Sequence, residues 1–566
     1  MVFGVFNKKG VNNSEKNYND SSPIYMDKYI KIYSEKKDQE KVIEDSNRII
    51  ILKFRNKIVK TKDIDFYKKL DGEFYCVIYN KKKKELSLVI DRLGLGDIFY
   101  SKKNESYLFS NSIKNLIKNG IKKEINNESL RYYLVYQFVP RPLTMFKGIV
   151  KVPAASIVDI NNGLIINKYW DLKFNSVYEN DERYHSNNVR KFLINSIKKN
   201  VNNLKTKKIG LLLSGGLDSS ILAYVLKDLK LDLHTFTGIY PYDNSYGGNK
   251  YGNKIAKEIN SKHSEIEIKT DAIKRLPELY DHMSEPLADS SMLQMHILME
   301  EAKKTTNNIF SGEFSDILFA GMDIYVKSKI SRLYWERLPK EKKVLVKNNS
   351  GSFVTEKFIE INEKLFEFKH YKYGDVSFTE DNINSIFNES IGSDFNNIEL
   401  NKPILQIYNN NNFKNELDKE IYTDLKLASQ RRIFHQLEPA KINNINLILP
   451  FTNNNLVEYS QKIPGELKIK GLKQKYILKE AFKEIIPNYI TQRKKEGFTA
   501  PYNLWFKNNK KWVLDQFKQN SLWSVEAKNY VKNILNKNNP DYDDNNRVWI
   551  LLNLSIWYQK VFSKLV

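Results

Sequence analysis

One short loop constrains the fold of this chain more than any other feature. Residues 208–213 are mostly apolar and predict a buried strand, and residues 218–229 have the apolar spacing of a helix. The loop that joins them, residues 214–220, reads Ser-Gly-Gly-Leu-Asp-Ser-Ser. In a parallel α/β sheet, ligands bind at the carboxyl ends of strands, where the N–H groups of a helix N-terminus face an anion. The pattern therefore predicts a parallel sheet with a phosphate site at this loop.

The residue types of the loop suit a nucleotide phosphate that is held together with a metal ion. Its glycines allow close backbone approach, and its serine hydroxyls add hydrogen-bond donors. Asp218 would repel a bare phosphate, so we expect it to bind a phosphate-bound Mg²⁺. The loop has no lysine after its last glycine, as a Walker loop has, and it is not the dinucleotide pattern GxGxxG. An isolated Ser-Gly-Gly is more often an ordinary turn, whereas the whole run after an apolar strand is far more specific.

The rest of the chain shows two different patterns. Residues 1–174 contain short β-branched and aromatic runs separated by turns, which predict a strand-rich domain with some helix. A polar stretch at 175–187 is the expected linker. From 188 to 566, strands first alternate with helices, which predicts a doubly wound parallel sheet, and the pattern beyond residue 320 is mainly helical. The strands expected in this second domain lie at 208–213, 232–240, 265–268 and 308–310. We therefore expect an α/β multidomain protein with a helical extension.

Composition argues against several classes of protein. No run approaches the ~18 to 20 apolar residues that a membrane span needs, and the N-terminus lacks the pattern of a signal peptide. The single cysteine, Cys76, excludes an internal disulfide and suits a reducing compartment, so we expect a cytoplasmic protein. The net charge of +24 is spread over scattered lysines rather than clustered, which favours a solvated surface over a nucleic-acid site.

Further motifs follow the loop in the order of one known family. Residues 213–220 resemble the pyrophosphate loop of the asparagine synthetase superfamily, whose members activate a carboxylate with ATP and release pyrophosphate. Five later segments also resemble family motifs: 284–291 (SEPLADSS), 311–321 (SGEFSDILFAG), 449–451 (LPF), 475–479 (KYILK) and 493–498 (RKKEGF). Because ordered matches of this kind are not expected by chance, the chain is identified as a member of this superfamily.

The resemblance implies a two-step reaction with ATP and Mg²⁺. A substrate carboxylate attacks the α-phosphorus of ATP, which gives an acyl-adenylate and pyrophosphate, and an amine then attacks the acyl carbon. Asp218 and Asp316 match the Mg²⁺ ligands of the family, and Lys495 matches the lysine that stabilises charge at the α-phosphate. Glu313 lies where the family deprotonates the nucleophile or contacts the activated substrate. The residues expected to bind ATP and pyrophosphate are Leu213, Ser214, Gly215, Gly216, Asp218, Ser219, Ser220, Thr237, Gly238, Gly312 and Lys475.

The acceptor side departs from the asparagine synthetases. Ile317 replaces the glutamate that follows the family's second metal ligand, and Phe314 replaces a glycine. Ile448 and Thr452 replace an arginine and a leucine around the Pro-Phe motif. We expect these changes to border the acceptor pocket, so the resemblance does not carry over to aspartate as the substrate. The run Ser-Asp-Ile is closer to β-lactam synthetase.

The first domain resembles the glutaminase domain of the family, which implies an αββα sandwich of the Ntn-hydrolase type. The resemblance rests on 91–95 (DRLGL) and 109–112 (FSNS). That fold releases ammonia from glutamine with a cysteine that follows the initiator methionine, and this sequence has Val2 there. Cys76 lies in an apolar run that is typical of a buried strand, so it cannot replace the nucleophile. We therefore expect an inactive glutaminase, as in β-lactam synthetase and in the cyclases of lasso peptides.

Together these features predict an AMP- and pyrophosphate-forming amide ligase whose amine is not made by its own glutaminase domain. A small-molecule or peptide carboxylate is the expected substrate. Lasso-type cyclisation is the favoured version, and it implies a precursor peptide and its processing protein as partners. Three alternatives stay open: an asparagine synthetase that uses free or externally supplied ammonia, a noncatalytic ATP-binding homologue, and an RNA-modifying ATP pyrophosphatase.

Overall fold

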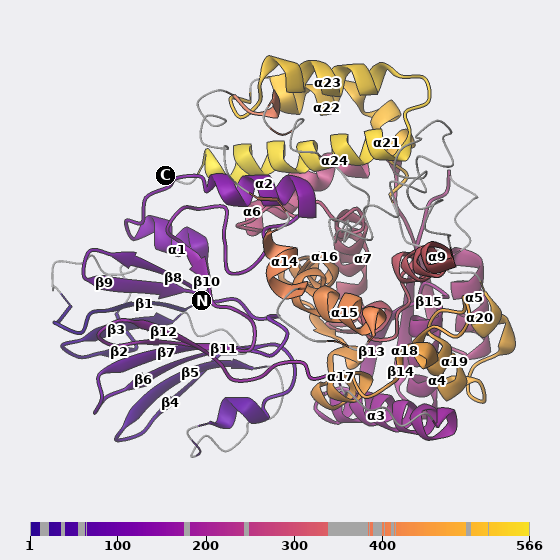
Figure 1. The fold of residues 1–566 in the computed structure, drawn as a ribbon, viewed down its shortest axis with the longest axis horizontal. Coiled ribbons are helices and arrows are strands. Elements are labelled where there is room, and N and C mark those ends of the chain that lie inside the picture. Colours follow the sequence, from indigo (N-terminus) through magenta and orange to yellow (C-terminus); the bar gives the residue numbers. More distant parts are fainter. Residues whose placement is uncertain are drawn as a thin grey trace.

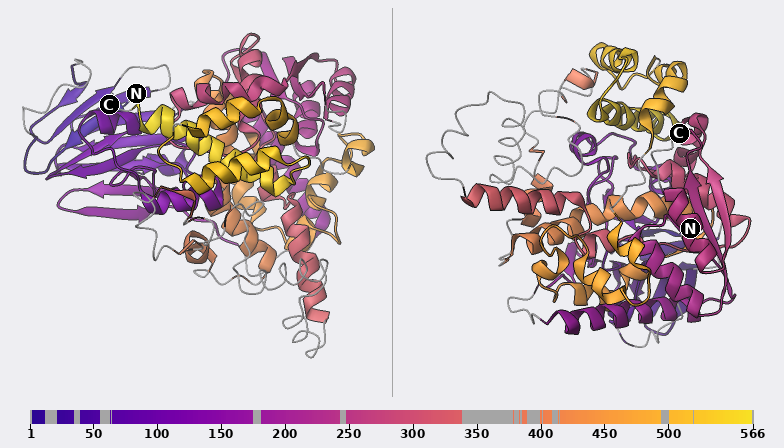
Figure 2. Two further views of the ribbon diagram at one scale, coloured as in Figure 1. Left: turned by 90° about the horizontal axis from the view of Figure 1, so that it is seen from above. Right: turned by 90° about the vertical axis from the view of Figure 1, so that its right-hand side faces the viewer.

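The chain folds into a strand-rich N-terminal part and a larger C-terminal part in which helices surround a sheet (Figure 1). The computed structural model describes residues 2–11, 22–34, 40–54, 63, 65–174, 181–242, 248–337, 378, 383, 385–388, 399, 400, 402–408, 413, 415–493, 500–518 and 520–564. The yellow C-terminal helices cover one end of the molecule in two of the three views (Figures 1 and 2). None of the helices in these residues is both long and apolar enough to cross a membrane.

The N-terminal domain consists of two stacked antiparallel sheets. The first has the order β10-β8-β9-β1-β3-β2 and the second the order β12-β11-β7-β6-β5-β4. The strands of the first are β1 (Val2–Phe6), β2 (Tyr25–Met26), β3 (Ile30–Ser34), β8 (Phe99–Lys103), β9 (Ser106–Ser110) and β10 (Val150–Lys151). Those of the second are β4 (Glu40–Glu44), β5 (Arg48–Phe54), β6 (Phe74–Asn80), β7 (Glu85–Ile90), β11 (Ser156–Ile160) and β12 (Leu164–Lys168).

Alternating apolar residues explain why these two sheets stack. Val2 and Phe6 of β1 pack with Ile49 and Ile51 of β5 in one buried cluster, so each sheet turns one face inward. The opposite face of the first sheet packs against α1 (Ile113–Lys118), and α2 (Asn127–Tyr136) follows it. A single turn of 3₁₀ helix, Phe66–Lys69, covers part of the second sheet. The sandwich predicted from the family resemblance is confirmed.

The C-terminal domain is built on a five-stranded sheet of the order β15-β14-β13-β16-β17. Every neighbouring pair is parallel, as the alternation of strands and helices predicts. The strands are β13 (Lys208–Leu212), β14 (Asp232–Ile239), β15 (Lys262–Glu267), β16 (Asn308–Phe310) and β17 (Asn446–Ile448). The order reverses between β13 and β16, and such a switch point leaves a crevice at the carboxyl ends of the strands. The edge strand β17 was not predicted, because its three residues follow a long helical region.

Helices cover this sheet and form the extension. Those of the α/β core are α3 (Glu182–Asn202), α4 (Leu217–Asp228), α5 (Gly248–Glu258), α6 (Leu276–His282) and α7 (Met292–Lys303). The later helices are α8 (Ser315–Leu318), α9 (Asp323–Arg337), α14 (Lys402–Tyr408), α15 (Glu416–Thr423), α16 (Ser429–Ile442), α17 (Asn454–Ser460), α18 (Gly465–Lys468), α19 (Tyr476–Phe482), α20 (Asn488–Gln492), α21 (Tyr502–Asn508), α22 (Lys510–Lys518), α23 (Val525–Asn536) and α24 (Tyr542–Trp557). The segment Asp424–Ala428 before α16 has π-helical geometry.

The predicted linker at 175–187 overlaps a helix. The Asp181 side chain caps α3 by accepting a 3.0 Å hydrogen bond from the Tyr184 N–H, and α3 begins at Glu182. The domain start expected at residue 188 therefore lies inside α3, because the cap signal was hidden in a polar stretch. Residues 175–180 lie outside the described residues.

Candidate active site

A cavity of about 620 Å³ opens at the carboxyl ends of β13, β14 and β16. Its lining combines residues predicted from the motifs with residues that follow them in the fold. The predicted residues in the lining are Leu213, Ser214, Gly216, Asp218, Ser219, Thr237, Gly238, Gly312, Glu313, Asp316 and Lys475. Of the other two in the loop, Gly215 shapes the turn, and Ser220 is buried and donates its hydroxyl to the Gly216 carbonyl at 2.6 Å. Lys495 lies outside the described residues.

The loop after β13 leaves the N-terminus of α4 open to this cavity. Gly215 has a φ of +70°, and a Cβ there would lie 2.5 Å from the Cβ of Tyr251 and 2.8 Å from the Gly252 nitrogen, so only glycine fits. The Gly216 N–H takes the Ser214 hydroxyl as its acceptor at 3.3 Å. Arg493 donates to the Gly215 carbonyl at 2.9 Å and so holds the loop from the opposite side.

One lysine joins the two carboxylates that are predicted to bind the metal. The Lys475 ammonium lies 2.5 Å from Asp218 Oδ2 and 2.7 Å from Asp316 Oδ1. Burial acts to lower the pKa of Lys475, but Asp218 and Asp316 outweigh burial and raise it above its ordinary value, so the ammonium stays charged. Gly321 makes room for this group, since a Cβ there would lie 2.0 Å from Lys475 Cε and 2.3 Å from Asp316 Oδ1.

This arrangement fits a shared Mg²⁺. Two carboxylate oxygens from different elements converge on the Lys475 ammonium, and oxygen ligands of this kind would suit Mg²⁺. Across the described part of the chain, no group of three or more His, Cys, Asp or Glu side chains could hold a metal. Phosphate oxygens and water would therefore complete the shell, as is usual for Mg²⁺ bound with a nucleotide.

Glu313 also lines the cavity, and it contacts α16. Burial raises the pKa of the Glu313 carboxyl above its ordinary value. Its Oε2 accepts a 3.0 Å hydrogen bond from Gln436 and lies 3.6 Å from His435 Nε2. The next residue, Phe314, adopts a φ of +83° with a fully buried ring. A left-handed phenylalanine is a strained conformation of the kind found at functional sites, and a glycine, as in the motif that this segment resembles, would adopt it without strain.

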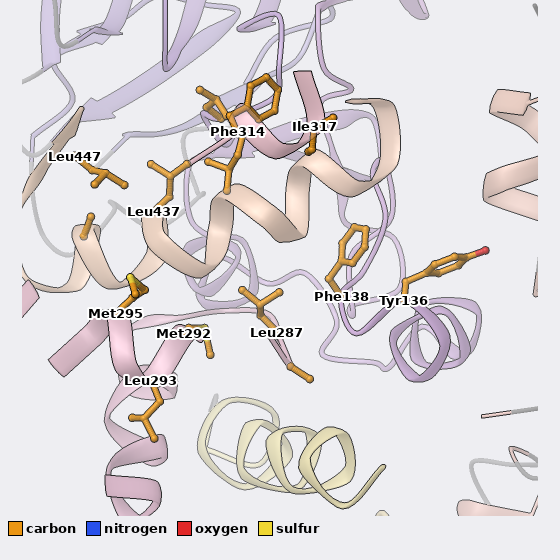
Figure 3. Close-up of a cluster of buried hydrophobic side chains, with 14 of the residues drawn as sticks. Tyr136, Phe138, Leu287, Met292, Leu293, Met295, Phe314, Ile317, Leu437 and Leu447 are labelled. Atoms are coloured by element: carbon orange, nitrogen blue, oxygen red, sulfur yellow. The ribbon is translucent and has the colours of Figure 1, made fainter. Parts of the chain in front are cut away.

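Helix α16 brings residues into the site that no motif predicted. Arg431, Arg432, His435 and Gln436 all line the cavity, and their spacing places them on one helix face. This spacing of polar side chains is the only sequence signal that could have found them. Figure 3 shows buried side chains around this helix. Leu437 lies on the helix itself, and Phe314 from the segment 311–321 and Met292 from α7 lie nearby.

Asp289 from the SEPLADSS segment faces this helix. Its carboxylate lies 3.5 Å from Arg431 Nε and accepts bonds from both the backbone and the hydroxyl of Ser291. Burial acts to raise the pKa of Asp289, but His435 and Arg431 lower it to about 2. The cavity lining therefore carries the negative charge of Asp289 beside the positive charges of Arg431 and Arg432.

Of the four substitutions expected to border the acceptor pocket, three do not line this cavity. Only Phe314 lines the cavity. Ile448 and Thr452 line a separate cavity of about 470 Å³ near the N-terminal domain, and Ile317 is buried in the core. Nearness to a motif in sequence does not determine the side toward which a strand or helix directs a given side chain.

Thr237 and Gly238 do lie at the end of β14, where the nucleotide was expected. The Thr237 hydroxyl, however, donates to the Leu213 carbonyl and so joins two strand ends.

Comparison with known proteins places this site in a family. The family described as Asparagine synthase matches residues 188–559, which is most of the chain, and the Glutamine amidotransferase domain matches residues 29–170. The chain belongs to the asparagine synthase family. It is therefore an ATP-dependent carbon–nitrogen ligase that forms AMP.

Three curated relatives are similar in sequence to this family member over most of its length. Asparagine synthetase [glutamine-hydrolyzing] 1 of Bacillus subtilis is 28% identical over 531 residues, which span 87% of this chain and 78% of the relative. Asparagine synthetase [glutamine-hydrolyzing] 3 of the same organism is 25% identical over 462 residues, which span 77% and 68%. The amidase chyE of Penicillium rubens is 22% identical over 501 residues, which span 79% and 72%.

The single thiol of this asparagine synthase-family member is buried in a strand. Cys76 lies in β6 between Leu52 of β5 and Val89 of β7, and it is fully buried. Burial raises the pKa of the Cys76 thiol, which keeps it in the unreactive neutral form. Val2 lies in β1 with its side chain in the core between the two sheets. The prediction that Cys76 is a buried strand residue is confirmed.

Proposed function

We propose that this protein adenylates a substrate carboxylate and joins it to an amine that its own N-terminal domain does not produce. The observation that carries the proposal is the state of the only cysteine in the sequence. Cys76 is buried in mid-strand with a raised pKa, and a glutaminase of this kind needs an accessible thiolate. Without it the domain makes no ammonia, so the amine comes from elsewhere.

The strand-end cavity supplies the groups for the first step. The N–H groups at the start of α4 would face the phosphates, and Asp218 and Asp316 would hold Mg²⁺, which would supply positive charge to stabilise the leaving pyrophosphate. Lys475 lies between these carboxylates, and its ammonium would add a positive charge beside the bound phosphates. Lys495 stabilises the charge that develops on the α-phosphate.

Glu313 acts in the second step. Its raised pKa and its position within the cavity suit a base that takes the proton from the attacking amine. Gln436 and His435 hold the carboxyl from one side, so its orientation is set before the substrate binds.

Two known reactions fit an amine that is part of the substrate itself: β-lactam closure and isopeptide closure of a lasso peptide. We favour the second, with a precursor peptide as substrate and its processing protein as partner in the cytoplasm. The Ser-Asp-Ile run and the buried cysteine support this class, and a basic chain of net charge +24 would attract an acidic peptide.

A second candidate is asparagine synthesis with free or externally supplied ammonia. The names of the Bacillus subtilis relatives favour it. Phe314 argues against it, since it is the one substituted residue that lines the cavity and it stands where the family motif has a glycine.

ATP–pyrophosphate exchange tests the proposal. The purified chain is assayed with L-aspartate, L-glutamate, malonate, N-acetyl-L-aspartate and a synthetic acidic peptide with a free N-terminus, and product mass is then measured with and without ammonium or glutamine. We expect exchange with at least one acid and no glutamate release from glutamine. Ammonium-dependent asparagine would establish the second candidate, and absence of exchange with peptide and small acids alike would reject the ligase assignment of this site.

A further inference from the structure

The N-terminal domain reaches the wall of the active-site cavity through the end of α2. Gln137 follows α2 in a left-handed conformation with a φ of 66° and is buried. Its N–H bonds to the Tyr133 carbonyl at 2.7 Å, which closes the last turn of the helix. Figure 3 shows Tyr136 and Phe138 on either side of this turn, with Phe138 next to α16.

Gln137 bonds to two separate parts of the cavity wall. Its side-chain oxygen accepts a 2.6 Å hydrogen bond from Arg431 Nη1 on α16. Its backbone carbonyl accepts a 2.9 Å bond from the Ala288 N–H, one residue before Asp289. Arg431 and Asp289 face each other at 3.5 Å and both line the cavity, so one residue of the N-terminal domain sets the relation between them.

The segment that carries Asp289 is held on its other sides as well. The Trp549 indole of α24 donates to the Ala288 carbonyl at 3.1 Å. Glu285 accepts the Met145 N–H at 2.7 Å and pairs with Lys151, both of the N-terminal domain. Hydrogen bonds and an ion pair therefore hold the segment between α24 and the N-terminal domain. Among the residues that hold it, Gln137 also contacts Arg431, which lines the cavity.

We propose that Gln137 is a positioning residue: it orients Arg431 so that its guanidinium binds a carboxylate of the acceptor substrate. Arginine recognises carboxylates through a planar fork whose direction must be fixed, and a charge-assisted bond to a buried amide oxygen fixes it. The proposed function underlies this inference, which also explains why a domain without glutaminase chemistry remains attached. We expect the ATP half of the site, at residues 214–220 and Lys475, not to depend on Gln137, whose hydrogen bonds go to Arg431 and the Ala288 N–H.

Chemical labelling of Arg431 tests the positioning directly. The full-length chain and its variants react with phenylglyoxal, and peptide mass spectrometry follows modification of Arg431. Gln137→Met keeps the side-chain length but removes the acceptor, and Gln137→Asn tolerates the left-handed conformation but falls short of Arg431. We expect both to label about fivefold faster than the wild type, because the guanidinium is released. Gln137→Glu, which keeps an acceptor, should label at the wild-type rate.

Tyr136→Phe is the matched control, because it removes a 2.6 Å bond to the Leu400 carbonyl from the same helix end without touching Arg431. It should label at the wild-type rate. Wild-type labelling in both Gln137→Met and Gln137→Asn would overturn the proposal, and so would faster labelling in Tyr136→Phe.

Kinetics separate this role from general support of the fold. With the acid that gives the fastest exchange in the panel above, Gln137→Met should raise KM for the acid about tenfold and leave KM for ATP within about twofold. Equal rises for both substrates would show a merely structural role and overturn the proposal. If no acid supports exchange in the wild type, the proposed function fails, while the labelling result still decides the role of Gln137.

Discussion

The two domains of this chain differ in the side chains that they bury and in the charges that they bring together. The N-terminal sandwich is well packed, but its cysteine is buried in β6 and its first strand begins with a buried valine. The C-terminal sheet instead gathers Asp218, Asp316 and Lys475 within hydrogen-bonding distance at the strand ends. Apolar packing alone can maintain a fold, whereas such a cluster of buried charges is costly without a function.

The contacts between the domains sharpen this comparison. Tyr133 of α2 donates to the Ile550 carbonyl of α24 at 3.0 Å, and Gln137 binds Arg431. The N-terminal domain is thus part of the surroundings of the cavity. The predictions below ask how far the chemistry is confined to the C-terminal domain.

Loss of Asp218 should have the largest effect. Asp218→Ala removes one of the two carboxylates proposed for Mg²⁺ and leaves the Lys475 ammonium with a single carboxylate partner. We expect ATP–pyrophosphate exchange to fall by about 10³-fold or more. Asp228→Ala, at the exposed end of the same helix, should exchange at the wild-type rate. Full activity in Asp218→Ala would remove the metal assignment.

Glu313→Gln should separate the two steps of the reaction. Amide formation should fall by about 10²-fold, since a glutamine cannot accept the proton, while exchange stays within about threefold. In the wild type, amide formation should decline as the pH drops through the raised pKa of Glu313, because the carboxylate base becomes protonated. The variant should lack this decline. Glu301→Gln, on the surface of α7, serves as the control. A loss of exchange in Glu313→Gln as large as its loss of amide formation would contradict a role limited to the second step.

Gly321→Ala should disturb the ATP site without unfolding the domain. The new methyl group would meet the flexible end of Lys475 and the Asp316 carboxylate, so these side chains shift rather than the backbone. We expect exchange to fall by about 10- to 100-fold, with the free energy of unfolding changed by less than about 1 kcal/mol. Gly163→Ala, which has open space around it, should match the wild type in exchange rate and in urea midpoint.

Cys76→Ala should have the smallest effect. The variant loses a buried sulfur atom, so the free energy of unfolding should drop by about 1 to 2 kcal/mol as measured in urea. Exchange and amide formation should stay within about twofold of the wild type, and neither protein should hydrolyse glutamine. Glutaminase activity that disappears in Cys76→Ala would break the distinction between the two domains.

Regular patterns were readable from the sequence, and isolated short elements were not. The four strands expected in the C-terminal sheet all form, because a run of apolar residues between helices leaves few other structures. The edge strand Asn446–Ile448 and the first turn of α3 were missed, because three residues carry no period and a polar helix start resembles a linker. Pairing with the neighbouring strand, rather than the strand preference of its own residues, stabilises such a strand.

By itself the sequence determined the nucleotide loop after β13, the parallel sheet and the family, since these depend on local patterns in order along the chain. Only the tertiary structure decided that Lys475 joins Asp218 to Asp316, and that α16 lines the cavity with its Arg431 bonded to Gln137. The reason is physical. Carboxyl ends of parallel strands always meet at one edge, but which helix covers that edge, and with which face, is set by packing among residues far apart in the chain.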